Sequence, residues 1–500
     1  MKNASTPLYD IHAIKDIEKR ALEVLNIASI TLMQRAALFV LGYLYKSYPD
    51  VKKIAVIVGA GRNGGDGYFF AQQALSAGFE VKIFYLADPN NLVDDVRKAY
   101  LAAKGMGVPC ESFTSSCLDD ADLIIDAMMG TGVNRALSGE WLGAAMLINR
   151  SGKPVISLDV PSGLNANTGA ILSEAVKATE TITFIAQKPG LYTGKGPEYV
   201  GKVICSDLGI PEECFESIHA ASCCFNLPTM AEWFPDRKKF NHKGNFGHIL
   251  VVGGYIGMAG AALLAGHAAL RIGAGRVSIA THPSHAIAMI PYHPELMVRG
   301  VNGAEDLAPM LEVATCIVIG CGLGTNEWSV ELMDAVLASG KPIVIDADGL
   351  NLIAQDKISK ELLEENKDNH VITPHPVEAA RLLHGTVNDV EADRLVTAYQ
   401  LSEKFGITVL KGAGSLVCDS DFLSINTTGN PAMASSGMGD ALSGIIAGLI
   451  VQGVSSRRAT RLGVWLHGLA GDLCAEQGYR SVIATDVIEF LPKAIARLKD

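Results

Sequence analysis

Asp440 has the clearest chemical setting in the sequence. It follows a glycine-rich stretch, residues 430–439, and opens an apolar helix predicted over residues 441–451. A helix start of this kind offers unpaired backbone N–H groups and the positive end of the helix dipole to an anion. A carboxylate there could take the proton of a hydroxyl group that attacks a phosphate. The alternative is that Asp440 only caps the helix; we favour the catalytic interpretation because the loop is long and a neighbouring segment supports it.

That neighbouring segment ends another predicted strand and reads Lys411-Gly412-Ala413-Gly414-Ser415. Its small residues leave backbone donors free, as a site for a nucleotide phosphate or ribose requires. Together with Asp440 it predicts a place where a phosphoryl group is transferred.

A different glycine loop lies near the N-terminus, where Gly59, Gly61 and Gly64 satisfy the pattern G-x-G-x-x-G. Asp88 ends the next predicted strand, about where a ribose-binding carboxylate would stand in an NAD-dependent dehydrogenase. The block Asn63-Gly64-Gly65-Asp66 fits that class poorly. It suggests instead an oxygen-lined pocket for a cation or a polar substrate, unless Asp66 only caps the following helix.

Two further acidic residues, Asp126 and Asp159, each end a predicted strand and precede a turn of small residues. Because the carboxyl ends of parallel strands meet at one edge of a sheet, we expect both carboxylates to converge with the Asn63–Asp66 block on one site.

The elements that must position these residues alternate between β-branched runs, glycine turns and helices, which is typical of an α/β protein with parallel sheets. The pattern runs twice. It predicts strands at residues 53–58, 80–86, 123–126, 154–159 and 181–184, and then at 248–252, 276–280, 316–319, 342–346, 371–373 and 408–411. A helical stretch over residues 14–48 precedes the first run; it could form an oligomer surface or only a packed flank. Residues 212–237 lack a strong strand pattern, so we place a domain boundary near residue 220.

Composition excludes several classes of protein. The chain has 500 residues, of which 49% are hydrophobic and 19% charged, so it can bury a large core. Its 53 acidic residues exceed 42 Lys and Arg, which argues against nucleic-acid binding. The sequence contains no run of about 18 apolar residues, the length that would predict a membrane span. Residues 1–10 do not resemble a secretory signal. Ten cysteines without C-x-x-C spacing fit reduced thiols and a cytoplasmic location.

The N-terminal motifs resemble those of the NAD(P)H-hydrate epimerase domain, with the domain placed at residues 10–218. The resemblance rests on four stretches: residues 63–67, 130–132, 159–163 and 188–190, the last reading Lys-Pro-Gly. It implies a Rossmann-like, doubly wound parallel sheet and a potassium ion held by Asn63, Asp126 and Ser162. Asp159, and less strongly Lys188, would then move protons at the substrate. Substrate contacts would come from Arg62, Asn63, Gly64, Gly65, Asp66, Gly130, Thr131, Gly132, Val133, Asn134, Arg135, Ala136 and Asp159. Arg62 departs from the Asn often found at its position in the family.

The C-terminal motifs resemble those of the ribokinase-like ADP/ATP-dependent NAD(P)H-hydrate dehydratases, over residues 225–498. They are residues 243–248, 253–262, 320–324, 346–351, 373–378 and 430–440, in the family's order. The resemblance implies that Ala262, Gly322, His375 and Asp440 contact the substrate, and that Lys411, Gly412, Ala413, Gly414, Ser415, Gly437 and Gly439 contact the nucleotide. Asp440 would be the catalytic base, and magnesium would accompany ADP or ATP.

The whole chain thus resembles the bifunctional NAD(P)H-hydrate repair enzymes, which combine an isomerase with a lyase. This implies hydrated NADH and NADPH and ADP or ATP as small-molecule partners, a homo-oligomer, and no nucleic-acid or membrane partner. The alternative is a ribokinase-like small-molecule kinase whose N-terminal nucleotide-binding domain is not catalytic. A non-catalytic nucleotide sensor is disfavoured by the acidic residues at both predicted sites.

Overall fold

A computed structural model describes residues 5–132, 135–237, 240 and 242–498. The chain divides into two compact units, Pro7–Ser222 and Cys223–Asp500, the latter joined by the first residues, up to Thr6. The division falls close to the boundary expected near residue 220.

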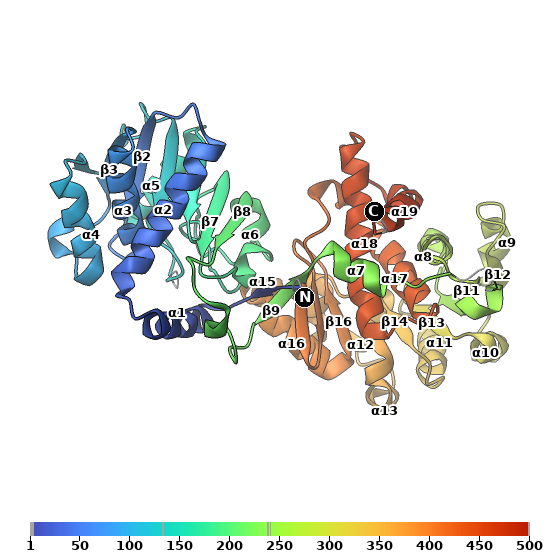
Figure 1. Ribbon diagram of the computed structural model, residues 1–500. Coiled ribbons are helices and arrows are strands. Elements are labelled where there is room, and N and C mark those ends of the chain that lie inside the picture. Colours follow the sequence, from blue (N-terminus) through green and yellow to red (C-terminus); the bar gives the residue numbers. More distant parts are fainter. Residues whose placement is uncertain (1–4, 133–134, 238–239, 241, 499–500) are drawn as a thin grey trace. The chain divides into compact units, whose positions relative to one another are not determined.

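The N-terminal unit is built on a seven-stranded sheet with the order β4-β3-β2-β5-β6-β7-β8. All of its strand pairs are parallel, so the predicted doubly wound class is confirmed. The order reverses between β2 and β5, and ligands bind at such reversal points in open α/β sheets. The elements, coloured blue to green in Figure 1, are α1 (Ile11–Leu25), α2 (Ser29–Ser47), β2 (Lys53–Val58), α3 (Arg62–Ser76), β3 (Glu80–Tyr85), α4 (Asp94–Gly105), β4 (Cys110–Ser112), β5 (Leu123–Ala127), α5 (Gly139–Arg150), β6 (Val155–Leu158), β7 (Glu180–Phe184), α6 (Gly196–Tyr199) and β8 (Lys202–Ser206).

Alternation along β2 explains how this sheet is covered on both faces. Ile54, Val56 and Val58 pack with residues of α1 to α4 in one core cluster. Ala55 and Ile57 point the other way and pack with residues of α5. A strand buried on both faces reads as a continuous apolar run, which is why the sequence located it correctly.

The C-terminal unit contains an eleven-stranded sheet with the order β1-β9-β18-β17-β16-β15-β14-β13-β10-β11-β12. Seven neighbouring strands, β12, β11, β10, β13, β14, β15 and β16, are all parallel. As in the first sheet, the order in which the chain adds strands reverses, here between β10 and β13. An antiparallel hairpin of β17 and β18 follows β16. The strands are β1 (Ser5–Leu8), β9 (Ser222–Phe225), β10 (His248–Val252), β11 (Arg276–Thr281), β12 (Met297–Gly300), β13 (Cys316–Ile319), β14 (Ile343–Ile345), β15 (His370–Ile372), β16 (Ile407–Leu410), β17 (Leu416–Asp419) and β18 (Phe422–Ile425).

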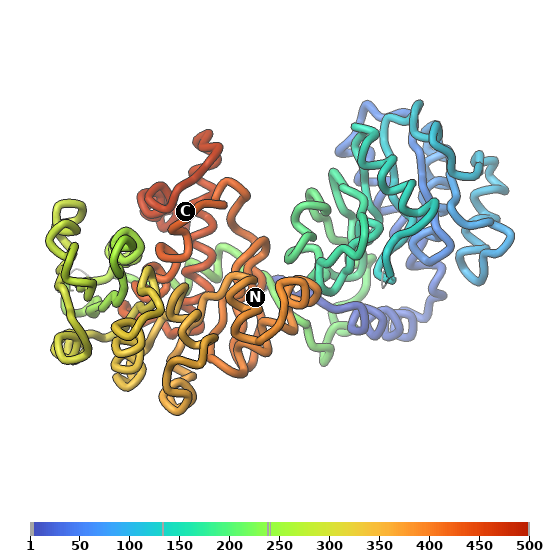
Figure 2. Tube along the Cα trace, turned by 180° about the vertical axis from the view of Figure 1, so that it is seen from behind, coloured from blue at the N-terminus to red at the C-terminus, as the bar shows by residue number. Residues whose placement is uncertain are grey.

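Helices cover this sheet, and on one side a further layer of helices packs on the first. The apolar helices α8 and α17 pack against the sheet residues Ile249 and Val251, and α18 and α19 pack on α17 in a second apolar cluster. In both Figure 1 and Figure 2 the yellow-to-orange helices α10 to α13 lie side by side along another part of the sheet. The helices are α7 (Leu227–Trp233), α8 (Ala259–Ile272), α9 (Ala286–Met289), α10 (Ala304–Val313), α11 (Glu327–Leu337), α12 (Asp348–Ala354), α13 (Lys360–Glu365), α14 (Pro376–Leu382), α15 (Val387–Ala392), α16 (Arg394–Phe405), α17 (Met438–Ile450), α18 (Ser456–Glu476) and α19 (Ala484–Arg497).

Some expectations differ from the structure. The single helical stretch over residues 14–48 is two helices, because Asn26 adopts the left-handed conformation that ends α1. Residues 212–237, where no strong strand pattern was found, contain the strand β9 and the helix α7. The strands β4, β8, β12, β17 and β18 were not predicted, since they are short or only partly apolar.

Among the described helices, none is by itself long and apolar enough to cross a membrane, although the bent pair α1 and α2 would qualify by length and composition.

The contact boundary makes a prediction about folding. Because each unit has its own sheet and apolar clusters, separate chains of residues 7–221 and 222–500 should each fold and unfold cooperatively. Thermal melts followed by circular dichroism test this. A fragment that stays unfolded alone but folds when mixed with the other would contradict it.

Candidate active sites

The first site forms where the N-terminal sheet reverses, and its glycines are required by close backbone approach. A Cβ atom on Gly59, which follows β2, would lie 2.1 Å from the carbonyl oxygen of Met128, and one on Gly64 would lie 2.1 Å from that of Gly59. Helix α3 begins at Arg62 after Gly61, so Asn63 to Asp66 form its first turns. Asp66 therefore lies inside the helix, and the interpretation that it caps the helix is wrong.

Asp126, at the end of β5, is fully buried and holds the turn that contains Ser162. Its carboxylate accepts hydrogen bonds from the Ser162 backbone N–H (2.9 Å), the Ser162 hydroxyl (2.6 Å) and the Ser157 hydroxyl (2.8 Å). The Met129 N–H in turn donates to Ser162 Oγ at 2.8 Å. Burial raises the pKa of Asp126, against the effect of these hydrogen bonds.

Asn63 differs from these residues because neither its amide nitrogen nor its amide oxygen has a hydrogen-bond partner, although both atoms are buried. A buried amide without partners costs free energy unless something else satisfies it. Gly130 brings Asn63 next to the turn around Met129, since a Cβ on Gly130 would lie 3.2 Å from the Asn63 Cβ. Asp126 and Ser162 are in direct contact, and Asn63 lies beside Gly130, the residue after Met129 of the adjoining turn. Oxygen donors of these types are those that a hard cation prefers.

A buried ion pair joins Asp159 and Lys188. The ammonium group of Lys188 lies 2.5 Å from Asp159 Oδ1 and also donates to Thr183 Oγ1 (2.7 Å) and the Phe184 carbonyl (2.8 Å). The Lys188 side chain is 1% exposed, whereas that of Asp159 is 17% exposed. Asp159 also has a φ of 67°, a left-handed conformation that is rare for a non-glycine residue and frequent at functional sites. Lys188 therefore fixes Asp159 with one part of its carboxylate accessible.

The pair faces a cavity of about 460 Å³ whose walls are partly apolar. Asp66 is also on its wall; burial raises the pKa of Asp66 well above its usual value, and the charge of Asp159 raises it further. The cavity thus brings Asp66, whose pKa is raised, together with the Asp159–Lys188 ion pair. Of the predicted residues, those that line it are Arg62, Asn63, Asp66, Gly130, Thr131, Gly132, Arg135, Asp159 and Lys188.

The other predicted residues of this site lie elsewhere. Gly64 and Gly65 are buried in α3, and Asp126 and Ser162 lie behind the lining. Ala136 is exposed and outside the lining, and Val133 and Asn134 fall outside the described residues. Arg62 forms an ion pair with Glu18 of α1 at the edge of the cavity.

Asp88 caps the short helix Pro89–Asn91 by accepting from the Asn90 N–H, so it does not act as the dehydrogenase hypothesis expects.

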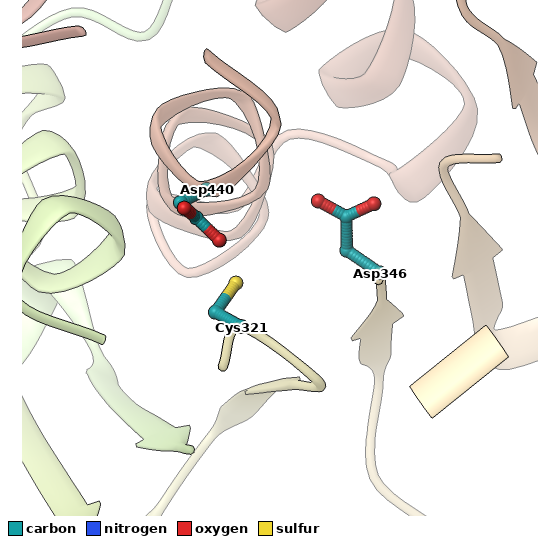
Figure 3. Close-up of side chains that lie close together, drawn as sticks. All are labelled: Cys321, Asp346 and Asp440. Atoms are coloured by element: carbon teal, nitrogen blue, oxygen red, sulfur yellow. The ribbon is translucent and has the colours of Figure 1, made fainter. Parts of the chain in front are cut away.

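The second site is centred on Asp346, directly after β14, and Asp440, in the first turn of α17. Helix α17 begins at Met438 with Gly437 before it, so Asp440 does not cap the helix and that alternative is wrong. Figure 3 shows both carboxylates close to Cys321, and one ligand atom of each of the three residues lies within 4.8 Å of the others. Burial and the charge of Asp346 raise the pKa of Asp440 to about 6, which suits a general base near neutral pH.

Lys411 compensates the buried charge of Asp346. Its Nζ lies 2.8 Å from Asp346 Oδ1 and 3.9 Å from Glu378 Oε2. Burial alone would raise the pKa of Asp346, but the ammonium group of Lys411 outweighs burial and holds it below its usual value. A Cβ on Gly439 would lie 2.9 Å from Asp346 Oδ2 and 3.0 Å from Lys411 Nζ. Only glycine therefore lets the start of α17 come this close to the ion pair.

The predicted nucleotide segment is the turn that joins β16 to β17. The Ser415 hydroxyl donates to the Gly412 carbonyl at 2.9 Å and accepts from the Gly412 N–H at 3.2 Å, which closes the turn. Gly412, Gly414 and Gly437 all have positive φ, so their conformations favour glycine. Ala413 lies within this turn.

Three predicted substrate residues surround the same region. Gly322 (φ 59°) follows Cys321, and Ala262 is fully buried on α8, where its Cβ lies near Gly254 after β10. His375 begins α14: its Nδ1 accepts the N–H of Val377 (3.1 Å), and Glu378 Oε2 accepts the N–H of His375 (2.8 Å). Glu378, whose pKa is raised by burial, is thereby held beside Lys411.

The sequence interpretation did not assign Asp346, Cys321 or Glu378 to the site. A signal for Asp346 was available, because it ends a predicted strand in the same way as Asp126 and Asp159. Cys321 and Glu378 lie within the family motifs at residues 320–324 and 373–378, but the sequence assigned them no role of their own.

Comparison with known proteins finds relatives of both units. A family described as NAD(P)H-hydrate dehydratase matches residues 249–493, and a family described as YjeF-related protein N-terminus matches residues 29–190. A bifunctional NAD(P)H-hydrate repair enzyme of Coxiella burnetii is 39% identical over 97% of this chain and 99% of its own. One of Escherichia coli is 37% identical over 96% and 92%.

Among solved structures, a ribokinase-like superfamily protein of Enterococcus faecalis is 28% identical, with a TM-score of 0.50 over 55% of this chain and 95% of its own. The predicted fold class of the C-terminal unit is confirmed by this likeness. With relatives this similar over nearly their whole length, the chain belongs to the family of bifunctional NAD(P)H-hydrate repair enzymes.

Proposed function

We propose that this enzyme repairs hydrated NADH and NADPH in two steps. The N-terminal unit interconverts the R and S epimers at C6 of the hydrated nicotinamide ring, and the C-terminal unit dehydrates the S epimer with ADP, giving AMP and phosphate, or with ATP. The observation that carries the proposal is the pair of acid–base sites on one chain, each at the carboxyl ends of the parallel strands of its own sheet, in a family whose named members are bifunctional.

The dehydratase step follows from the chemistry of the leaving group. Hydroxide leaves poorly at neutral pH, so the C6 oxygen first attacks the terminal phosphorus of the donor, and the P–O bond to the rest of the nucleotide breaks. Asp440 accepts the proton of the C6 hydroxyl. The lone pair of the ring nitrogen then expels phosphate from C6, and loss of a proton from C5 restores the dihydropyridine. The backbone N–H groups around Gly437 and Gly439 would stabilise charge on the transferred phosphoryl group.

The carboxylate of Asp346 fits magnesium, which prefers oxygen ligands and is commonly bound through one or two carboxylates and nucleotide phosphates. Burial and the two carboxylates raise the pKa of Cys321 well above its usual value, so its thiol is protonated and offers no hard ligand. Magnesium would supply charge neutralisation to the phosphates of the donor.

The epimerase step requires proton transfer at the C6 hydroxyl, for which Asp159 is the candidate. Lys188 holds one oxygen of Asp159 and keeps its charge compensated, while the cavity wall keeps bulk water away from the ring. Ring opening with reclosure, or loss and return of water, would both invert C6.

Potassium is the cation proposed for the first site, held by Asn63, Asp126 and Ser162. The unpartnered amide of Asn63 supports this most directly, because an ion would satisfy its buried oxygen. An ion there would fix the loop around Gly130 beside Asp159.

A small-molecule kinase with an inert first domain is the alternative. It is not favoured, because the N-terminal unit carries the Asp159–Lys188 pair against a cavity. A homo-oligomeric state and a cytoplasmic location stay predictions.

Replacing the proposed base should separate the activities. Asp440→Asn is expected to slow nucleotide-dependent dehydration by roughly 10²–10⁴-fold and to leave epimerisation unchanged. Formation of NADH from its hydrate, followed by absorbance, measures the first activity, and the exchange of epimers measures the second. Dehydration within a few-fold of the wild type would exclude Asp440 as the base.

The same variant should change stability in a defined direction. The pKa of Asp440 is about 6 in the folded protein and near its ordinary value of about 4 in the unfolded chain. Between about pH 4 and 6 the folded state therefore binds this proton more tightly than the unfolded state, so the free energy of unfolding of the wild type falls as the pH rises through this range. Asp440→Asn lacks that cost, so its C-terminal unit should melt at a higher temperature than the wild type at pH 8 and not at pH 4. An equal or lower melting temperature at pH 8 would contradict the shifted pKa.

The pH dependence of catalysis should report the same group. Since the base must be ionised, kcat/KM for dehydration should fall about tenfold per pH unit below pH 6, while epimerisation by the same protein serves as the control. A midpoint near pH 4 would mean that Asp440 titrates as an ordinary carboxyl group.

The cation assignment can be tested at Asn63, because its side chain makes no hydrogen bond whose loss would unfold the site. Asn63→Ala is expected to raise the potassium concentration needed for half-maximal epimerisation at least about tenfold, with stability changed by less than about 1 kcal/mol. Ser157→Ala is the matched control: it removes a bond to Asp126 and should lower stability without changing the potassium response. Identical potassium titrations of Asn63→Ala and the wild type, at fixed ionic strength, would reject the assignment.

A further inference from the structure

Three aromatic side chains meet beside the dehydratase site and were assigned no role above. The ring centroids of Tyr255 and His282 are 5.3 Å apart, those of Tyr255 and Trp328 are 5.5 Å apart, and those of His282 and Trp328 are 5.9 Å apart. All three side chains are half-buried. We call Tyr255, His282 and Trp328 the aromatic platform.

The platform is fixed in place by backbone contacts. The Trp328 Nε1–H donates to the Val301 carbonyl at 3.0 Å, and the His282 Nδ1 accepts the Ser284 N–H at 3.3 Å. The exposed side chains of Ile256 (56%) and Met258 (38%) continue the apolar surface along the same loop. Rings held this way present a preformed surface, so little ordering is needed for another ring to stack on them.

The platform is joined directly to the catalytic loop. The Tyr255 N–H donates to the Gly322 carbonyl at 2.6 Å, and Gly322 follows Cys321, which lies beside Asp440 and Asp346. A Cβ on Gly324 would lie 3.5 Å from the Tyr255 ring. Tyr255 thus rests on the same loop, residues 320–324, that borders the catalytic carboxylates.

The order of the strands separates the platform from the donor site. Tyr255 follows β10, His282 follows β11, and Trp328 lies in the first turn of α11, the helix after β13. The sheet order β16-β15-β14-β13-β10-β11 places them on one side of Asp346, which follows β14, and the turn at residues 412–415, which follows β16, on the other. The platform also surrounds the reversal between β10 and β13, the position at which such sheets bind ligands.

Only one part of the proposed substrate is a flat aromatic ring. Hydration makes C5 and C6 of the nicotinamide tetrahedral, and C6 must lie at Asp440 for the reaction to occur. The adenine at the other end of the dinucleotide is planar and can reach away from the reacting carbon. Base–aromatic stacking contributes about 1–3 kcal/mol per base, which is a factor of roughly 5 to 150 in affinity.

We propose that the aromatic platform binds the adenine ring of the hydrated dinucleotide during dehydration. This inference rests on the proposed function. It assigns the platform to the acceptor substrate and leaves the turn at residues 412–415 to the phosphoryl donor.

The test compares the hydrate of NADH with the hydrate of reduced nicotinamide mononucleotide, which has the same reacting ring and no adenine. With the full-length protein, Tyr255→Ala should raise the KM for hydrated NADH about tenfold and leave the KM for the mononucleotide within twofold of the wild type. The kcat and the KM for ADP should not change. Tyr255→Phe keeps the ring and should keep the wild-type KM.

Tyr479→Ala is a matched control, because Tyr479 is a half-exposed tyrosine of the same unit that contacts Phe490 instead. It should leave every constant unchanged. Trp328→Phe is a second platform variant, which loses the bond to Val301 and part of the ring. It should raise the KM for hydrated NADH less than Tyr255→Ala does.

Equal effects of Tyr255→Ala on both hydrates would overturn the assignment, since they would mean a structural role. An increase in the KM for ADP instead would place the donor's adenine on the platform, which also overturns it. If the wild-type protein dehydrates neither hydrate, the proposed function itself fails, and this outcome is distinct from the other two.

Discussion

Each unit of this protein buries a lysine–aspartate ion pair at the carboxyl ends of its parallel strands, and the rest of each site is arranged around that pair. Lys188 with Asp159 and Lys411 with Asp346 are both close contacts, at 2.5 Å and 2.8 Å. Removing such charges from water costs several kcal/mol per ion, and removing one partner leaves the other uncompensated. The pairs therefore need additional hydrogen-bond partners. In the first site Thr183 Oγ1 and the Phe184 carbonyl accept from Lys188, and in the second the Ser443 hydroxyl donates to Asp346.

In each site a second carboxyl group lies near the charged pair, and the charge of the first carboxylate raises its pKa. Asp346 is held ionised by Lys411, and its charge raises the pKa of Asp440 to about 6. In the first site the charge of Asp159 acts in the same direction on Asp66. Pairs of carboxyl groups with separated pKa values can divide the roles of acid and base between them. Glycines such as Gly439 and Gly130 let backbone approach these groups closely enough for the effect.

The sequence predicted the strands that are buried on both faces, such as β2, β10 and β13, because their apolar runs are continuous. It missed edge strands and the β17–β18 hairpin, whose pairing depends on neighbours distant in the chain. At the sites, turns of small residues after strands indicated Asp126 and Asp159, and a glycine-rich loop before a helix indicated Asp440. The isolated amide of Asn63, the burial of Lys188 and the proximity of Cys321 to two carboxylates depend on packing between segments far apart in sequence, so no local pattern could reveal them.

Strand β1 is synthesised first but belongs to the sheet of the C-terminal unit, which is synthesised last. It lies at the edge of the C-terminal sheet beside β9, so the first described residues of the chain belong to a sheet whose other strands are made after the whole N-terminal unit. Because chains are synthesised at about 5–20 residues per second, β9 is completed on the order of 10–40 s after β1. During that time its backbone groups have no partner in the sheet, and the N-terminal unit can fold as a closed insertion between two strands that pair only later. A bulky fusion at the N-terminus would therefore hinder the pairing of β1 with β9 in the C-terminal unit, rather than the folding of the unit next to it in sequence.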